Sequence, residues 1–194
     1  MNGKTILSLC DYSGNWSQPY RDAGYTVVQV DIQHGQDVRL LRKIDGYVHG
    51  ILAAPPCTHF SRAGAHLWAG KGEAAILEGL AVVDACLRAV AIYRPVWWAL
   101  ENPIGRLKDY LGEPAWKFDP CDFGDPYTKR TWLWGNFTPP GGLFAPAECQ
   151  PVEPEFVNVA GKRYDRTTWI GSKGRVERST TPAGFARAFM EANR

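Results

Sequence analysis

The chain has 194 residues, of which 45% are hydrophobic and 22% charged, and its net charge is +2, a balance typical of a globular protein in solution. This length suffices for a single domain with a sizeable core, and no apolar stretch approaches the roughly 18 residues that a membrane span needs. The five cysteines are odd in number and never paired as C-x-x-C, which argues against a disulfide framework or a metal site and favours a reducing, cytoplasmic location.

Apolar runs alternate with helical patterns along most of the chain. A strand pattern begins directly at Lys4, so we expect no signal peptide. Alternating strands and helices predict an α/β fold with a doubly wound, mostly parallel sheet, in one domain over residues 1–194. The Pro- and Gly-rich stretch 138–154 predicts irregular loop. Strands are expected at 4–9, 25–32, 47–53, 96–100 and 131–135, and helices at 14–23, 73–93 and 182–193.

Charge is unevenly distributed. From residue 160 onward there are eight Lys and Arg residues against three acids, a net charge of +5, so the first 159 residues carry −3. A basic carboxy-terminal segment is what a phosphate backbone attracts, although a solvated basic surface has the same composition.

Chemically active residues follow two of the predicted strands. Ala54-Pro55-Pro56-Cys57 comes directly after the run 47–53, and Glu101-Asn102 comes 44 residues after the cysteine, behind the run 96–100. Segments just past parallel strands line the ligand crevice of such a sheet. A thiolate can add to an electron-poor ring, and a partly desolvated carboxyl can donate a proton. The alternatives are a buried structural cysteine for Cys57 and a helix cap or surface ion pair for Glu101.

The first strand-to-helix turn and the end of the second strand suit a nucleotide cofactor. The turn holds Gly14, and Asp31 ends the second strand, where an acid accepts hydrogen bonds from ribose hydroxyls. Later in the chain, Lys129 and Arg130 precede an aromatic strand and could hold a phosphate or a base, with solvated surface as the alternative.

Taken in order, these motifs resemble those of the cytosine-C5 DNA methyltransferases. The resemblance runs from about residue 5 to 137 and resumes at 179–190; it is most specific at Pro55-Pro56-Cys57 with Phe60-Ser61, and at Glu101-Asn102. Arg130, five residues before Gly135, stands at the second arginine of the family's Gln-x-Arg-x-Arg motif. Ser179-Thr180-Thr181-Pro182 resembles the last motif, which returns to the cofactor.

The resemblance implies a Rossmann-like fold, S-adenosylmethionine as cofactor and DNA as substrate. Cys57 would attack C6 of a flipped-out cytosine, Glu101 would protonate or hydrogen-bond its N3 and amino edge, and Arg130 would hold the base. The cofactor would contact Leu9, Cys10, Tyr12, Ser13, Gly14, Asn15, Asp31, Ile32, Asp37, Val38, Pro56, Thr180 and Thr181. The substrate would contact Ser61, Asn102, Lys129, Lys162 and Arg163.

The chain departs from the family in three places. Cys10 stands where the family usually has Phe against the adenine, and Tyr12 and Asn15 replace two glycines, so either the cofactor sits somewhat differently or it is a modified form. Pro126 and Thr128 occupy the Gln and first Arg positions of the later motif.

The third departure is a deletion. Only residues 138–178, a short basic segment, stand in place of the usual target-recognition domain. We expect a monomer with short or relaxed sequence specificity, or recognition supplied by a protein partner. Because phage enzymes are often this compact, we expect a phage gene expressed in a bacterial cytoplasm. The same chemistry on RNA or a nucleotide, and a non-catalytic relative that binds cofactor or DNA, are the alternatives.

Overall fold

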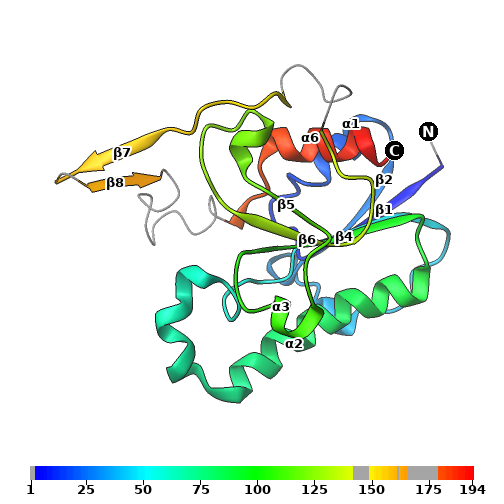
Figure 1. The fold of residues 1–194 in the computed structure, drawn as a ribbon. Coiled ribbons are helices and arrows are strands. Elements are labelled where there is room, and N and C mark those ends of the chain that lie inside the picture. Colours follow the sequence, from blue (N-terminus) through cyan, green and yellow to red (C-terminus); the bar gives the residue numbers. More distant parts are fainter. Residues whose placement is uncertain (1–2, 142–148, 161, 166–178) are drawn as a thin grey trace.

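A six-stranded sheet lies between two layers of helices in the computed structural model (Figure 1). The structure describes residues 3–141, 149–160, 162–165 and 179–194, without the side chains of residues 159, 162, 163 and 165. Helices α1 and α6 cover one face of the sheet, and α2 and α3 cover the other.

The elements follow in chain order, with short 3-10 turns labelled η. Strands are β1 (Thr5–Leu9), β2 (Thr26–Val30), β3 (Val48–Ala53), β4 (Trp97–Pro103), β5 (Trp116–Phe118), β6 (Thr131–Asn136), β7 (Phe156–Val159) and β8 (Lys162–Asp165). Helices are α1 (Gln18–Asp22), α2 (Trp68–Tyr93), α3 (Lys108–Leu111) and α6 (Ala183–Ala192). The 3-10 turns are η1 (Ile32–His34), η2 (Val38–Leu40), η3 (Arg62–Leu67) and η4 (Pro120–Phe123).

Sheet topology places two loops at one crevice. The strand order is β2-β1-β3-β4-β6-β5; the pairs among the first four strands are parallel, and β6 runs antiparallel to both β4 and β5. The order reverses between β1 and β3, so the loops that leave these two strands diverge there. Ligands of doubly wound sheets bind at such a switch point, outside the carboxyl ends of the strands. The predicted α/β class with a mostly parallel, doubly wound sheet is confirmed.

Period-two alternation of the strands builds a separate core on each face. Ile6 of β1 packs beneath α1 and α6, whereas Leu7 and Leu9 pack beneath α2. On the first face, Phe185 of α6 is fully buried and stacks on Phe118 at a centroid distance of 4.0 Å. Burying aromatic side chains of this size, Phe185 and the equally buried Phe189, stabilises the docking of the ten-residue α6.

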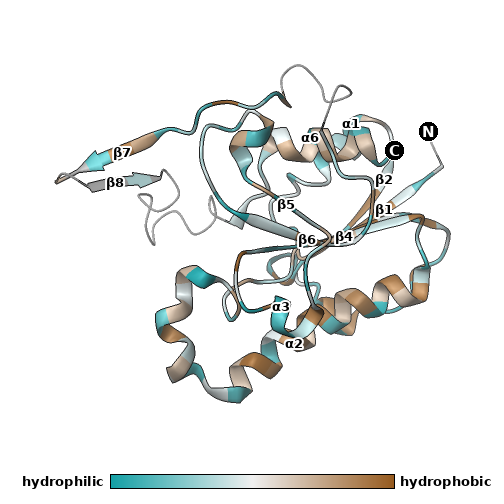
Figure 2. Ribbon diagram, in the orientation of Figure 1, coloured by the Kyte–Doolittle hydropathy of each residue, from teal (hydrophilic) through white to brown (hydrophobic). Residues whose placement is uncertain are grey.

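The predicted strands and long helices are all present, with changed bounds. Strand β4 continues through Glu101 and Asn102 to Pro103, so these two residues lie within the strand and not behind it. Helix α2 begins at Trp68 but is interrupted by Gly72, whose φ of +65° is non-helical, so its regular part starts at the predicted residue 73. Along α2, polar residues are interspersed with apolar ones (Figure 2), and its buried residues include Val83, Cys86 and Ala89.

Several elements were not predicted, among them the short helix α3, strand β5 and the β7–β8 hairpin. The three-residue β5 forms the sheet edge beside β6. Within the segment 138–178, which was expected to be loop, β7 and β8 pair as an antiparallel hairpin that extends away from the sheet (Figure 1). Residues 138–141 and 150–155 carry no helix or strand, as expected. No helix in the described ranges is long and apolar enough to cross a membrane.

Candidate active site

Cys57 lies in the loop that leaves β3. Its carbonyl oxygen accepts hydrogen bonds from the backbone N–H groups of Phe60, at 3.0 Å, and Ser61, at 2.9 Å, so residues 57–61 form a tight turn. The side chain of Cys57 is half-buried. Ala54 N–H donates to the carbonyl of Leu9 at 2.9 Å, which holds the start of this loop beside the end of β1. The turn therefore presents Cys57 at the switch-point edge of the sheet.

Glu101 lies on the adjacent strand, β4. Its carboxylate is 12% exposed, and Oε1 lies 3.8 Å from Nζ of Lys129, which is 16% exposed. Desolvation by burial raises the pKa of Glu101 above its usual value, and the nearby Lys129 ammonium offsets part of that rise. A carboxyl in this setting holds a proton at higher pH than an exposed glutamate does, which suits it to act as an acid.

Side-chain and backbone hydrogen bonds join the β3 loop to the end of β4. The fully buried Asn102 donates from Nδ2 to the carbonyl of Pro55 at 2.9 Å. Arg62 N–H donates to Ile104 O at 2.8 Å, and Arg106 N–H donates to Phe60 O at 2.9 Å. The segment that carries Cys57 is thus fixed to the segment that follows Glu101.

Gly105 permits this contact. A Cβ atom at residue 105 would lie 1.9 Å from Phe60 O and 2.8 Å from Phe60 C, which are backbone atoms and cannot rotate away. Residues 61 and 105 also form an isolated β-bridge, and Ser61 Oγ accepts from Ala63 N–H at 3.3 Å at the start of η3. Only glycine fits where the two backbones approach this closely.

Lys129 and Arg130 have different surroundings. Arg130 is 65% exposed, and its Nε lies 3.4 Å from Oδ2 of Asp119. Asp119 also accepts from the Lys129 N–H at 2.9 Å, and burial raises its pKa while Arg130 lowers it. The structure therefore brings Lys129 to Glu101 and leaves Arg130 paired with Asp119.

Asp11 organises the turn after β1. This buried carboxylate accepts hydrogen bonds from the hydroxyls of Ser8 at 2.9 Å and Ser17 at 3.1 Å, and from the Gly14 N–H at 3.0 Å. Ser13 Oγ lies 3.4 Å from it, and Gly14 has a φ of +70°, in the left-handed region that favours glycine. Tyr12 and Asn15 are exposed on the outer side of the same turn.

The ends of β2 and η1 supply a carboxylate flanked by apolar groups. Asp31 is buried, and its Oδ1 accepts from the Gln33 N–H at 2.8 Å. Tyr12 and Ile32 are 42% and 64% exposed, and the Tyr12 ring lies 5.2 Å from that of His34 in η1. Exposed apolar side chains beside a buried carboxylate fit a ribose with an attached flat base.

Asp37 and Val38, which are also predicted to contact the cofactor, lie further along, at the start of η2. Asp37 forms an ion pair with Arg39 at 2.6 Å, and hydrogen bonds from Arg39 lower its pKa. Val38 is buried against α2.

Cys10 follows β1 with a left-handed φ of +58°, and its N–H donates to Val30 O at 2.7 Å. The neighbouring thiol of Cys10, together with burial, raises the pKa of the Cys86 thiol in α2.

The remaining predicted residues lie nearer the carboxy terminus or in the β3 loop. Thr181 is buried and Thr180 half-buried just before α6, while Pro56 is exposed beside Cys57. Lys162 and Arg163 belong to β8, in register with Val159 and Asn158, but their side chains lie outside the described residues.

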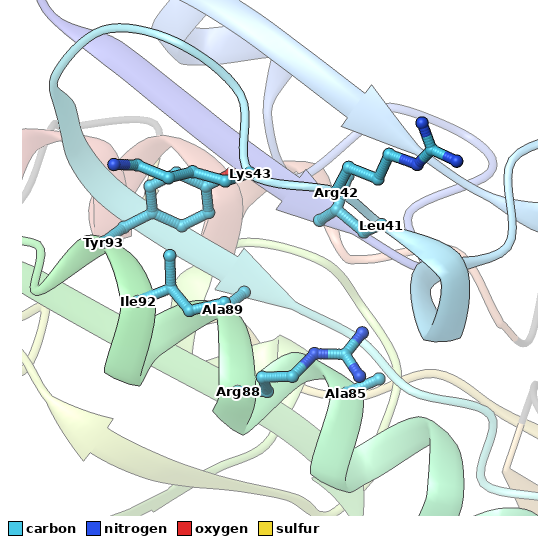
Figure 3. Close-up of a pocket in the computed structure, with 8 residues that line it drawn as sticks. All are labelled: Leu41, Arg42, Lys43, Ala85, Arg88, Ala89, Ile92 and Tyr93. Carbon is cyan, nitrogen blue, oxygen red and sulfur yellow. The ribbon is translucent and has the colours of Figure 1, made fainter.

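A separate groove lies on the α2 face, with about 190 Å³ of empty space that is partly open to solvent (Figure 3). None of the predicted site residues lines it. Its walls are Leu41, Arg42, Lys43, Ala85, Arg88, Ala89, Ile92 and Tyr93.

Comparison with known proteins places the fold. No protein-family model matches the sequence, and no curated protein matches it. A solved structure of a candidate DNA modification methyltransferase, encoded within a prophage in E. coli, is similar with a TM-score of 0.51 and 20% sequence identity, over 77% of this chain and 52% of that one. The chain therefore shares the α/β, Rossmann-like fold of that structure, and it spans about half the length of that structure.

Sequence reasoning did not select Asp11, Asp119 or Gly105. The sequence around Asp11 does not reveal the four hydrogen-bond donors of its carboxylate, because two of them, Ser8 and Ser17, lie outside the turn. Asp119 and Gly105 matter through contacts with distant residues, which a single sequence does not display. No group of three or more His, Cys, Asp or Glu side chains that could hold a metal occurs among the residues described.

Proposed function

We propose that this chain is an S-adenosylmethionine-dependent methyltransferase that methylates carbon 5 of cytosine in DNA through a covalent bond between Cys57 and C6. The observation that carries the proposal is that the Cys57 loop is joined to β4 beside the largely buried Glu101, at the carboxyl ends of neighbouring strands. The fold, and the likeness to a candidate DNA modification methyltransferase, support methyl transfer to DNA.

Cys57 would supply the nucleophile. Its thiolate forms a bond with C6, the C5–C6 double bond opens toward C5, and the Glu101 carboxyl gives its proton to N3 of the ring. C5 then takes the methyl group, loses its own proton to a base, and the ring re-forms its double bond as the S–C6 bond breaks. Glu101 recovers its proton in that second half, so both residues return to their starting state.

The turn after β1 and the end of β2 would hold the cofactor. Asp31 would accept hydrogen bonds from the ribose hydroxyls, and the exposed Tyr12 and Ile32 would flank the adenine. The thirteen residues predicted for the cofactor lie on four segments: the end of β1 with the turn after it, the segment after β2, the loop after β3, and the residues before α6. When bound, S-adenosylmethionine supplies the electrophilic methyl group; the chain's own residues orient it at the switch point.

DNA contacts outside the pocket stay predictions. Arg130 is predicted to hold the base, which requires it to leave Asp119. Lys162 and Arg163, in the extended hairpin, are predicted to grip the phosphate backbone. Because residues 138–178 are short, we infer relaxed sequence specificity or recognition by a partner.

A duplex that contains 5-fluorocytosine tests the covalent step. Fluorine cannot leave C5 as a proton does, so the bond between Cys57 and C6 persists after methyl transfer. We expect a denaturation-resistant protein–DNA complex that requires S-adenosylmethionine, disappears in Cys57→Ala and remains in Cys121→Ala, a matched control in η4. A complex of equal yield in Cys57→Ala would contradict the proposed nucleophile. Cofactor binding without any complex would favour RNA, a nucleotide or a non-catalytic role.

A further inference from the structure

Strand alternation assigns opposite faces of the sheet to Lys129 and Arg130. Within β6, Leu133 packs in the core beneath α1 and α6, while Trp132 and Trp134 pack beneath α2. Extending this alternation to the two residues just before β6 puts Lys129 on the Leu133 face and Arg130 on the Trp132 face. Leu133 is the register partner of Glu101 in β4, so Glu101 and Lys129 share a face.

Hydrogen bonds hold the Lys129 backbone in this orientation. Its N–H donates to Asp119 Oδ1 at 2.9 Å, and its carbonyl accepts from Thr131 Oγ1 at 2.6 Å. The backbone of the next residue, Arg130, is bonded to the segment that follows β4, because Ile104 N–H donates to Arg130 O at 3.0 Å. The side chain of Lys129 is therefore directed inward on a fixed backbone, and its ammonium group lies 3.8 Å from Glu101 Oε1.

We propose that Lys129 is the positioning cation of the active site, which holds the Glu101 carboxyl in place and stabilises the carboxylate left when Glu101 gives its proton to the base. This inference rests on the proposed function of the same site. It assigns Lys129 to Glu101 and not to a phosphate of the substrate, and it separates the role of Lys129 from that of its neighbour Arg130.

The proton balance explains why a cation is needed there. As the S–C6 bond forms, the O–H bond of Glu101 breaks and an N3–H bond forms, which leaves a negative carboxylate that is only 12% exposed. An uncompensated buried carboxylate opposes this step. The ammonium group of Lys129 is already in place, so the charge is met without reorganisation.

The other neighbours of Glu101 cannot do this. Leu133 faces it from β6, and the buried amide of Asn102 is committed through Nδ2 to Pro55. Among the residues that the structure describes, Lys129 is the one charged side chain that acts on the Glu101 pKa, against the larger opposing effect of burial. Arg130 is occupied by Asp119.

A direct titration tests the pairing without any need for activity. Carboxyl signals of glutamate, labelled with carbon-13, would be followed by NMR against pH in the complete chain, and the Glu101 signal would be assigned by its loss in Glu101→Gln. We expect the Glu101 midpoint to move to higher pH in Lys129→Met and to stay near wild type in Lys129→Arg. Lys108→Met is the matched control, because Lys108 forms an exposed pair with Glu113. An unchanged midpoint in a folded Lys129→Met protein would overturn the inference.

Activity provides the second readout. Lys129→Met is expected to slow methyl transfer by about a factor of 10 or more at neutral pH and to move the pH–rate profile in the same direction as the titration, with rescue by Lys129→Arg. A slower rate with an unmoved profile would indicate a structural role only, and would overturn the inference.

The two failures are distinguishable. If the Glu101 midpoint shifts but wild-type protein transfers no methyl group to cytosine, the pairing is real and the proposed function is wrong. If wild-type protein methylates cytosine and the midpoint does not shift, the proposed function stands and Lys129 has another role.

Discussion

Replacing Gly105 by alanine separates the two segments that form the candidate site. The new Cβ would lie 1.9 Å from Phe60 O, far inside the contact distance, and the neighbouring atoms are backbone. To admit the methyl group, residues 60–62 must move away from residues 104–106. That movement breaks the hydrogen bonds from Arg62 N–H to Ile104 O and from Arg106 N–H to Phe60 O.

The expected cost follows from those two effects. Overpacking of a tight contact costs about 1–3 kcal/mol, and each hydrogen bond contributes about 0.5–1.5 kcal/mol. We therefore expect Gly105→Ala to lower the free energy of unfolding by about 2–6 kcal/mol, measured by urea denaturation. Since the Cys57 loop moves relative to Glu101, the yield of covalent complex on 5-fluorocytosine DNA should fall as well.

Gly64→Ala is the matched control. Gly64 lies in η3, three residues after Ser61, and a Cβ there meets nothing within 4 Å. The same chemical change should leave stability equal or raise it by about 0.4–1 kcal/mol. If Gly105→Ala were as stable and as reactive as Gly64→Ala, the close contact between the two loops would be absent in solution and the reasoning would be refuted.

Three further predictions concern the β1 turn, the core and the charge on Glu101. Asp11→Ala should remove the carboxylate that accepts from the buried Ser8 hydroxyl and the Gly14 N–H, while Ser17 keeps the Gly14 carbonyl; it should lower stability by about 1–3 kcal/mol and weaken binding of S-adenosylmethionine in calorimetry, whereas Asp22→Ala, in an exposed position, should do neither. Phe185→Ala should cost about 3–5 kcal/mol in thermal or urea unfolding, and a cost below 1 kcal/mol would mean that α6 is not docked as described. Burial raises the pKa of Glu101 in the folded protein above its value in the unfolded chain. At a pH between these two pKa values, the folded protein therefore binds more protons than the unfolded chain. The contribution of Glu101 to stability is present at low pH and is lost as the pH rises through the folded-state pKa. Glu101→Gln should therefore gain stability over wild type at neutral pH, by about 1.4 kcal/mol per unit of pKa difference, and that gain should vanish below the pKa of an ordinary glutamate.

Local pattern was sufficient to predict the sheet and its long helices. The runs that hold Leu7, Leu9 and Val83 bury apolar side chains at strand or helix spacing, and that information is contained in neighbouring residues. The same patterns predicted Cys57 in the loop after its strand, but they predicted Glu101 behind a strand in which it in fact lies. The apolar run predicted a strand that is shorter than β4. The polar residues at the end of β4 belong to the strand because they pair with β6, and their composition does not indicate this.

The features that the sequence did not predict depend on pairing between segments that are far apart in the chain. Lys129 meets Glu101 because β6 runs antiparallel to β4 in one particular register, and a shift of one residue would have presented Arg130 instead. The hairpin β7–β8 was not predicted because its basic segment lacks a two-residue turn signal such as Asn-Gly. Asp119 belongs to the site only through its contacts with Lys129 and Arg130.

The central claim is methyl transfer to C5 of cytosine by Cys57. Wild-type protein, Cys57→Ala and Cys121→Ala would each be incubated with tritiated S-adenosylmethionine and unmethylated duplex DNA, followed by mass spectrometry of the nucleosides. The account predicts 5-methyldeoxycytidine with wild type and Cys121→Ala, and none with Cys57→Ala. Full methylation by Cys57→Ala, or no methylated cytosine from a wild-type protein that binds the cofactor, would contradict it.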